Sequence, residues 1–213
     1  MTKTDFVYDY LREKYADNEA ILLSEIQIPD MTEVAIRQQI KKLTDSGRLR
    51  RYDTGVYYFP RKTMFQSEGT LSVEEVVRRK YIEDKDGAFG YRGGLYLANR
   101  LGLTTQVPAV MEVYSNKATT DYRETQVADM RVVVRKPYVK VTSQNVAALQ
   151  FLDLLKEVVD IVEVDREELK TRLLSYMKAK KLGFDALQEY LPYYPERIYR
   201  NMYEVGLLYG ISS

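Results

Sequence analysis

The apolar residues near the N-terminus recur at the spacing of amphipathic helices. A helix over Thr4–Tyr15 is predicted by five residues that repeat every three or four positions: Phe6, Val7, Tyr10, Leu11 and Tyr15. A short second helix is expected over Leu23–Ile26. It is expected to end before Pro29, because a proline disfavours helical backbone at the residue before it. A third helix is predicted to begin after Thr32, whose hydroxyl is a good N-cap.

The third predicted helix is followed by a glycine and a short hairpin. Its apolar stripe consists of Ile36, Ile40 and Leu43, and Gly47 fits the position just past a helix end. The strands "RLRRY" and "VYYF" then flank a turn in which Gly55 can adopt a positive φ. Three helices closed by a hairpin are the order of a winged helix-turn-helix domain.

The pattern changes after residue 62. The polar stretch "TMFQSEGT" predicts a linker, which divides the chain into residues 1–65 and residues 70–213. In the second part, "AVMEVYS" and "MRVVVRKPYVKVT" are predicted strands, and the chain from Ser143 onward is predicted to be helical. The predicted fold class is α+β: a winged helix-turn-helix, followed by a mixed α/β domain of short strands and helices with a helical tail.

Charge is distributed unevenly along a nearly neutral chain. The 213 residues carry a formal net charge of +1, but residues 34–65 hold eight basic side chains against two acidic ones. A local net charge of +6 is typical of a surface that binds an anion such as nucleic acid.

The composition argues against several other functions. Histidine and cysteine are both absent, which removes the commonest general base, the commonest metal ligand and thiolate chemistry. No nucleophile–base pair or metal-binding pattern is visible, so neither enzymatic activity nor a cofactor is expected. No apolar run is long enough to span a membrane and the N-terminus lacks a signal sequence, so a cytoplasmic location is expected.

The basic block supplies the candidate DNA-binding residues. On a helical wheel, Arg37, Gln38, Lys41 and Lys42 lie opposite the apolar stripe of the third helix. Arginine and glutamine can contact base edges in the major groove, and lysine can contact phosphates or guanine. The predicted DNA-binding residues are Thr32, Arg37, Gln38, Lys41 and Lys42 on the helix and Arg48, Arg50, Arg51, Arg61 and Lys62 around the wing.

Other readings of this pattern remain open. Exposed helix faces are often rich in lysine and glutamine simply because these residues are well solvated, so a protein-docking adaptor that does not touch DNA is the alternative.

Secondary DNA contacts are assigned to basic residues of the second domain: Arg92, Arg131, Arg135, Lys136, Lys140, Lys178, Lys180 and Lys181. The glycines of "GYRGG" could bind an anion, but close packing of the following helix explains them better. Four acids, Asp153, Glu157, Asp160 and Glu163, are expected to form one solvated helix face.

Two stretches resemble a known family. The segments "IRQQIKKLTDSGRLRRYDTGVYYFP" and "GYRGGLYLANRLGLTTQVPAVMEVYSN" are similar to the AbiEi family, the antitoxins and transcriptional regulators of type IV abortive-infection systems. The resemblance covers about Phe6 to Val162, and the helical tail from about Asp165 matches no motif of the family.

The resemblance implies a function for each domain. A winged helix-turn-helix would bind inverted repeats in the promoter of its own operon and repress it. An inverted repeat calls for two copies on the operator, and whether these are monomers that meet only there or a preformed dimer is left open by the sequence. The C-terminal domain would oppose a nucleotidyltransferase-like toxin without forming a stable complex with it. These expectations come from the resemblance and not from charge or spacing.

Overall fold

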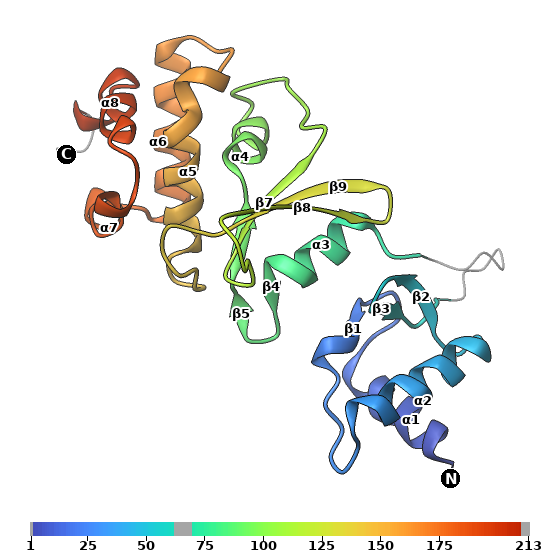
Figure 1. Ribbon diagram of the computed structural model, residues 1–213. Helices are drawn as coiled ribbons and strands as arrows, with labels where there is room; N and C mark the ends of the chain where they lie inside the picture. Colours follow the sequence, from blue (N-terminus) through green and yellow to red (C-terminus); the bar gives the residue numbers. More distant parts are fainter. Residues whose placement is uncertain (1, 62–69, 210–213) are drawn as a thin grey trace. The chain divides into compact units, whose positions relative to one another are not determined.

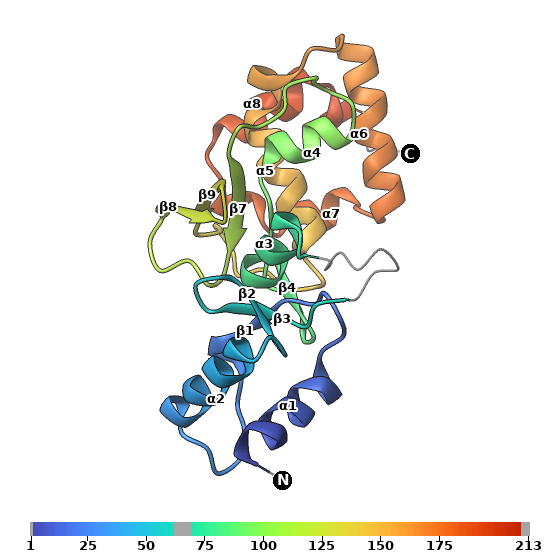
Figure 2. The ribbon, with the colours of Figure 1, turned by 90° about the vertical axis from the view of Figure 1, so that its right-hand side faces the viewer.

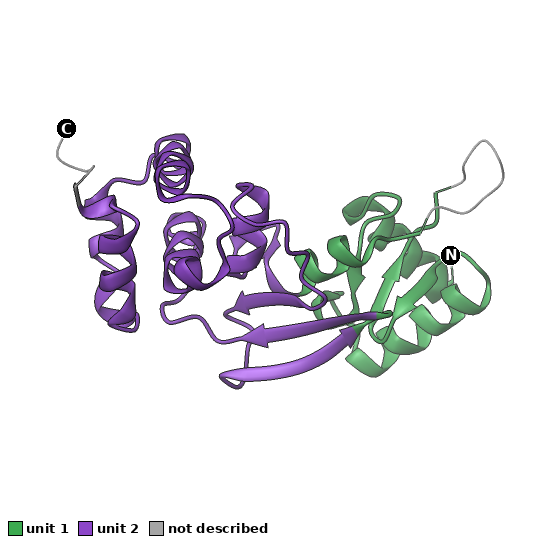
Figure 3. Ribbon diagram, turned by 90° about the horizontal axis from the view of Figure 1, so that it is seen from above, with its two compact units in different colours: residues 1–80, 127–129 green, residues 81–126, 130–213 purple. Residues whose placement is uncertain are grey.

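The computed structural model describes residues 2–61 and 70–209, and the chain divides into two compact units (Figure 1, Figure 3). Unit 1 comprises residues 1–80 and 127–129, and unit 2 comprises residues 81–126 and 130–213. Both units contain helices and strands, which is compatible with the predicted α+β class. The predicted linker and domain boundary fall on residues 62–69, outside the described part of the chain.

Unit 1 is built on a small antiparallel sheet with the order β1-β3-β2. Its elements, in chain order, are α1 (Lys3–Lys14), β1 (Ile21–Leu22), the 3-10 turn η1 (Leu23–Glu25), α2 (Glu33–Asp45), β2 (Arg50–Asp53), β3 (Val56–Tyr58) and α3 (Val73–Tyr81), whose last residue belongs to unit 2. The short helix predicted over Leu23–Ile26 is present as the 3-10 helix Leu23–Glu25, with Ile26 just past its end. Residues Ile21 and Leu22 pair with β3, and this pairing holds the backbone extended up to the start of the turn.

Local signals set both ends of α2. The Thr32 hydroxyl accepts a hydrogen bond from the Ala35 N–H at 3.2 Å, as an N-cap should. Past the other end, Gly47 has a φ of +73°, and this left-handed conformation lets the chain leave the helix and enter β2. The apolar stripe of α2 is buried in the core of unit 1 together with Val7 and Leu11 of α1. The predicted helix, its cap and its glycine stop are therefore confirmed.

Two basic residues at the end of α3 form ion pairs within unit 1. The guanidinium of Arg79 in α3 pairs with Glu25 at 2.7 Å, and its side chain is only 8% exposed. Lys80 lies 3.7 Å from the carboxylate of Asp53. These two ion pairs explain why residues 70–80 group with unit 1, although the sequence pattern assigned them to the second domain.

Unit 2 contains a four-stranded sheet with the order β6-β7-β9-β8. The strands of this sheet are β6 (Gly90–Arg92), β7 (Met111–Ser115), β8 (Tyr122–Val127), whose last residue belongs to unit 1, and β9 (Met130–Arg135). Strands β4 (Glu83–Asp84) and β5 (Gly87–Ala88) form a separate two-stranded sheet. Strands β6 and β7 are antiparallel, whereas β7 and β9 are parallel. The strand predicted over "AVMEVYS" is confirmed at β7. The strand predicted over "MRVVVRKPYVKVT" is confirmed only over Met130–Arg135, because β9 ends before Pro137 and Lys136 and Lys140 lie outside it.

One helix forms the centre of unit 2. The helices are α4 (Gly94–Arg100), α5 (Val146–Ile161), α6 (Arg166–Lys180), α7 (Phe184–Gln188) and α8 (Arg197–Glu204), with the 3-10 turns η2 (Leu191–Tyr193) and η3 (Leu207–Tyr209). Helix α5 contacts α4, α7 and α8, and it lies beside α4 in two perpendicular views (Figure 1, Figure 2). Apolar residues on several sides of α5, including Leu149, Phe151 and Leu154, are completely buried, as expected of a helix enclosed by other elements. The helical tail completes this core.

The glycines of "GYRGG" permit close packing. A Cβ at Gly94 would lie 2.9 Å from the carbonyl oxygen of Asp153, so α4 packs directly against the backbone of α5. A Cβ at Gly90 would lie 2.0 Å from the carbonyl oxygen of Tyr81. Both positions exclude any larger residue, which supports the packing explanation of these glycines.

Candidate nucleic-acid interface

Helix α2 presents a polar, basic face to solvent. Arg37, Gln38, Lys41 and Lys42 are all exposed, whereas Ile36, Ile40 and Leu43 are at most 3% exposed. The two faces are separated as the helical wheel predicted, because the apolar stripe packs on the core of unit 1. The structure thus leaves all five predicted helix residues exposed, and Thr32 also caps the helix.

The charge of Arg37 is available despite a nearby acid. Its guanidinium lies 3.3 Å from Glu33 in an ion pair one turn apart, with side chains 64% and 84% exposed. An exposed pair of this kind contributes little, about 0.3–0.5 kcal/mol. A phosphate or a base edge could therefore replace Glu33 at small cost.

The arginines of the hairpin differ in their surroundings. Arg51 donates hydrogen bonds to the Asp53 carbonyl and the Thr54 hydroxyl, both at 3.3 Å, and so lies along the turn of the hairpin. The Arg50 guanidinium lies 3.9 Å from the position of a Cβ on Gly47, next to the C-terminal end of α2. Arg61 is exposed beyond β3, and Lys62 lies outside the described residues. Arg50 therefore lies close to the C-terminal end of α2.

Arg48 is held by α1. Its guanidinium forms an ion pair with Asp5 at 2.8 Å and lies 3.7 Å from the centre of the Tyr8 ring. Hydrogen bonds, first from the Thr2 hydroxyl and then from Arg48, lower the pKa of Asp5 to about 2. Because the guanidinium is engaged with a carboxylate and a ring, its contacts indicate a structural role in fastening α1 to the turn after α2.

The secondary basic residues do not form one surface. Arg131 pairs with Glu124 at 3.1 Å, Arg135 pairs with Glu112, and the lysines at positions 136 and 140 are exposed beyond β9. Lys178, Lys180 and Lys181 are exposed at the C-terminal end of α6, where the helix dipole favours cations. Their predicted DNA contacts remain predictions.

Two of these residues, far apart in sequence, meet in a cavity of unit 2. Arg92 and Arg135 both line a space of about 350 Å³ together with Glu112. The remaining lining residues are Gly93, Leu95, Tyr96, Pro108, Ala109, Val110, Tyr122 and Val133. The sequence pattern gave no sign of this cavity, because its residues come from β6, α4, β7, β8, β9 and the loop before β7.

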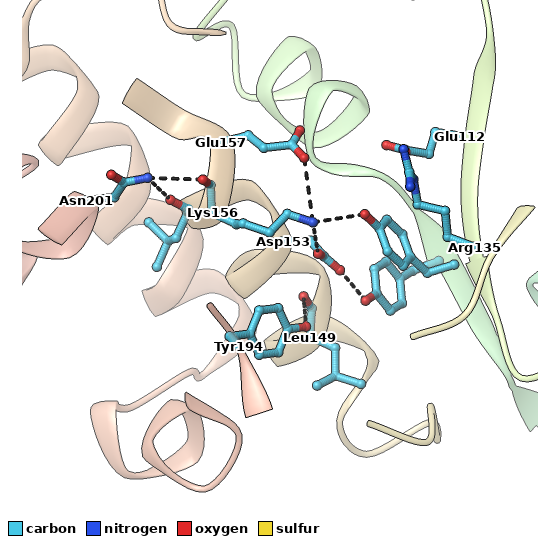
Figure 4. A network of polar contacts seen from close by, with 11 residues as sticks. Glu112, Arg135, Leu149, Asp153, Lys156, Glu157, Tyr194 and Asn201 are labelled. Atoms are coloured by element: carbon cyan, nitrogen blue, oxygen red, sulfur yellow. Dashed lines mark hydrogen bonds and ion pairs between the residues drawn. The ribbon is translucent and has the colours of Figure 1, made fainter. Parts of the chain in front are cut away.

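A buried polar network also escaped sequence analysis. The Lys156 ammonium lies 2.9 Å from a carboxylate oxygen of Asp153, and it donates to the Tyr114 hydroxyl at 3.0 Å. The Tyr91 hydroxyl donates to the other carboxylate oxygen of Asp153. Figure 4 shows Asp153 and Lys156 at the centre of this network, with Asn201 donating to backbone carbonyls of α5 from α8.

The expected solvated acidic face is therefore wrong at Asp153, which is only 1% exposed. Burial raises the pKa of its carboxyl group. Burial by itself would lower the pKa of Lys156, but the charge of Asp153 and the Tyr114 hydroxyl outweigh it and raise that pKa. A signal was present in the sequence: the segment "FLDLLKEVV" places Asp153 and Lys156 inside an otherwise apolar run.

Two negative findings concern only the described residues. Within residues 2–61 and 70–209, no three histidine, cysteine or acidic side chains are grouped so that they could hold a metal ion. None of the helices in those ranges has the length and apolar content needed to cross a membrane.

A comparison with protein families finds one match. The model of a family of unknown function, DUF6088, matches residues 12–182, from within α1 to just past the end of α6. No curated protein matches the chain. Because the matched region includes most of the 213 residues, the chain belongs to the DUF6088 family.

Proposed function

We propose that the protein is a sequence-specific DNA-binding repressor of its own operon, and that unit 1 is a winged helix-turn-helix domain. The observation that carries the proposal is the clean division of α2 into a buried apolar stripe and an exposed face of Arg37, Gln38, Lys41 and Lys42. The order of elements α1, β1, α2, β2, β3 and the sheet order β1-β3-β2 support a wing formed by the β2–β3 hairpin. In this proposal the turn η1 takes the place of the middle helix.

The exposed residues divide into two roles. Arg37, Gln38 and Lys41 lie in the N-terminal two-thirds of α2 and would contact base edges in the major groove. Lys42 and the exposed arginines at positions 50, 51 and 61 would contact phosphates, which position the protein without reading sequence. Arg48 is assigned to packing in unit 1 because of its contacts with Asp5 and Tyr8.

The composition of the α2 face favours DNA over a protein partner. Protein interfaces have cores enriched in aromatic and apolar residues and depleted in lysine. The exposed face of α2 holds two lysines and has no aromatic residue, and Val34 is its exposed apolar residue. A docking adaptor remains the competing function, and the DNA measurements below separate the two.

The first prediction concerns salt. If about six phosphates are contacted, a plot of log affinity against log salt concentration should have a slope of about −5. The measurement is fluorescence anisotropy of the full chain with a labelled duplex that contains the inverted repeats of its own promoter, between 50 and 300 mM KCl. Absence of binding at the lowest salt would rule out the repressor function, and equal affinity for a scrambled duplex would rule out sequence specificity.

We further propose that unit 2 acts as an antitoxin against a nucleotidyltransferase-like toxin. The proposal is supported by the AbiEi-like segment at residues 90–116, which forms β6, α4 and β7. The toxin would be opposed without a stable complex, and the protein would act in the cytoplasm as a monomer that meets a second copy only on the operator.

The second prediction separates this activity from DNA binding. A full-length Arg37→Ala/Gln38→Ala/Lys41→Ala variant should still restore growth when co-expressed with the toxin, because these residues lie in unit 1. Growth of cells carrying the toxin with an empty vector provides the baseline. Failure of the unmodified chain to restore growth would refute the antitoxin proposal and leave the DNA proposal standing.

A further inference from the structure

The cavity of unit 2 has the features of a small-molecule site. Its volume of about 350 Å³ falls within the range of about 300–1,000 Å³ found for ligand pockets. Its walls combine apolar side chains with a small number of charged groups, which is also characteristic of such pockets. The lining residues come from α4, from the loop before β7 and from the strands of the four-stranded sheet.

Both guanidiniums of the cavity are held on aromatic rings. The Arg92 guanidinium lies 4.1 Å from the centre of the Tyr96 ring, and the Arg135 guanidinium lies 5.1 Å from the centre of the Tyr122 ring. Stacking on a ring orients the flat guanidinium while leaving in-plane N–H groups able to donate hydrogen bonds. The rings therefore hold both guanidiniums in fixed orientations.

Hydrogen bonds also hold Arg92 and Arg135 in place. The Gln150 side chain of α5 donates a hydrogen bond to the Arg92 carbonyl at 2.9 Å, which ties β6 to the central helix. The Arg135 Nε–H donates to Glu112 on the adjacent strand β7. A Cβ at Gly93 would lie 2.5 Å from the Glu112 carboxylate, so the glycine leaves room for this acid. Such preorganised groups lose little entropy when a ligand binds.

The charges that line the cavity indicate the charge of the ligand. Two guanidiniums and one carboxylate line the cavity, and their formal charges sum to +1. A ligand with a single negative charge would balance this charge, whereas a dianion would leave an excess negative charge beside Glu112. A carboxylate suits the planar guanidinium geometry.

The uncharged walls indicate the rest of the ligand. Leu95, Val110 and Val133 supply apolar surface, and the rings of Tyr96 and Tyr122 supply flat surface. We propose that this cavity binds a small molecule that carries a planar ring and one anionic group, with a carboxylate preferred over a phosphate monoester. The proposal does not depend on DNA binding or on antitoxin activity.

The test is isothermal titration calorimetry on the full chain with defined probes. Benzoate and indole-3-acetate represent ring carboxylates, adenosine 5′-monophosphate represents a ring phosphate, and adenosine and inorganic phosphate represent each half alone. At least one ring carboxylate should bind saturably, and more tightly than adenosine monophosphate. The result that overturns the charge assignment is tighter binding of the phosphate, and lack of saturable binding of all probes at 5 mM overturns the site itself.

One substitution is expected to weaken ligand binding and another to strengthen it, and loss of structure could not cause both results. Arg92→Ala should weaken binding of the ring carboxylate roughly tenfold to hundredfold, as expected for loss of a charge-assisted hydrogen bond. Glu112→Gln removes the negative charge of the cavity and should strengthen binding of adenosine monophosphate about tenfold. The matched control is Arg131→Ala on β9, which removes an exposed guanidinium outside the cavity. Equal affinities in the Arg92→Ala variant and the unmodified chain would overturn the proposal.

Discussion

Replacing Lys156 with methionine is expected to lower the free energy of unfolding of unit 2 by about 3–5 kcal/mol, the usual cost of breaking a buried ion pair by removing one partner. Asp153 would keep its burial and its hydrogen bond from Tyr91 but lose the ammonium at 2.9 Å. An unpaired carboxylate is costly in a site that is only 1% exposed. The measurement is urea denaturation followed by far-UV circular dichroism.

The sign of the pH dependence provides an independent check. Burial already raises the pKa of Asp153 in the folded chain, and loss of the neighbouring cation should raise it further. The free energy of unfolding that Lys156→Met loses is therefore lost in full above this raised folded-state pKa. The loss becomes smaller as the pH falls through that pKa, because the carboxyl group of Asp153 becomes neutral. The deficit of Lys156→Met should thus be smaller at acidic pH than at pH 7.

Two further variants test whether the loss comes from the unpaired charge. In Lys156→Met/Asp153→Leu both charges are removed, so most of the lost stability should return. Lys178→Met, at an exposed position of α6, should change the free energy of unfolding by less than about 0.5 kcal/mol. If the single and double variants at 153 and 156 were equally unstable, the unpaired carboxylate would not be the cause.

The proposed DNA-reading role predicts an equally large effect on affinity. Substituting alanine for Arg37, Gln38 and Lys41 together should weaken binding to the promoter duplex by at least about 100-fold, because each good base contact contributes roughly 1–3 kcal/mol. The three side chains are exposed on α2 and none of them packs in the core, so stability should be nearly unchanged. Fluorescence anisotropy with the specific duplex measures the loss.

The control for this prediction removes the same number of charges elsewhere. Arg197→Ala/Arg200→Ala deletes two exposed positive charges on α8, to match the two charges lost from α2. Its affinity for the duplex should stay within about threefold of that of the unmodified chain, since the proposal assigns no phosphate contact to α8. A comparable loss in both variants would mean that net charge, and not the face of α2, governs binding.

The sequence by itself determined the features that depend on neighbouring residues. The cap at Thr32, the stop at Gly47 and the turn at Gly55 each follow from the conformational preference of one residue type. The exposed basic face of α2 follows from the 3.6-residue period, because burial of Ile36 and Ile40 places Arg37 and Lys41 outside. These features could be predicted because their causes lie within one turn of helix or one hairpin.

Tertiary structure decided the features that depend on distant partners. The stretch expected to be the second helix leads out of β1 because Ile21 and Leu22 find their strand partner 34–36 positions later. Arg48 has a structural role because Asp5 lies beside it, and Arg92 meets Arg135 only through the strand order of the sheet in unit 2. Asp153 is buried because α5 is enclosed by α4, α8 and the sheet, and the period of a helix does not indicate how many of its sides will be covered.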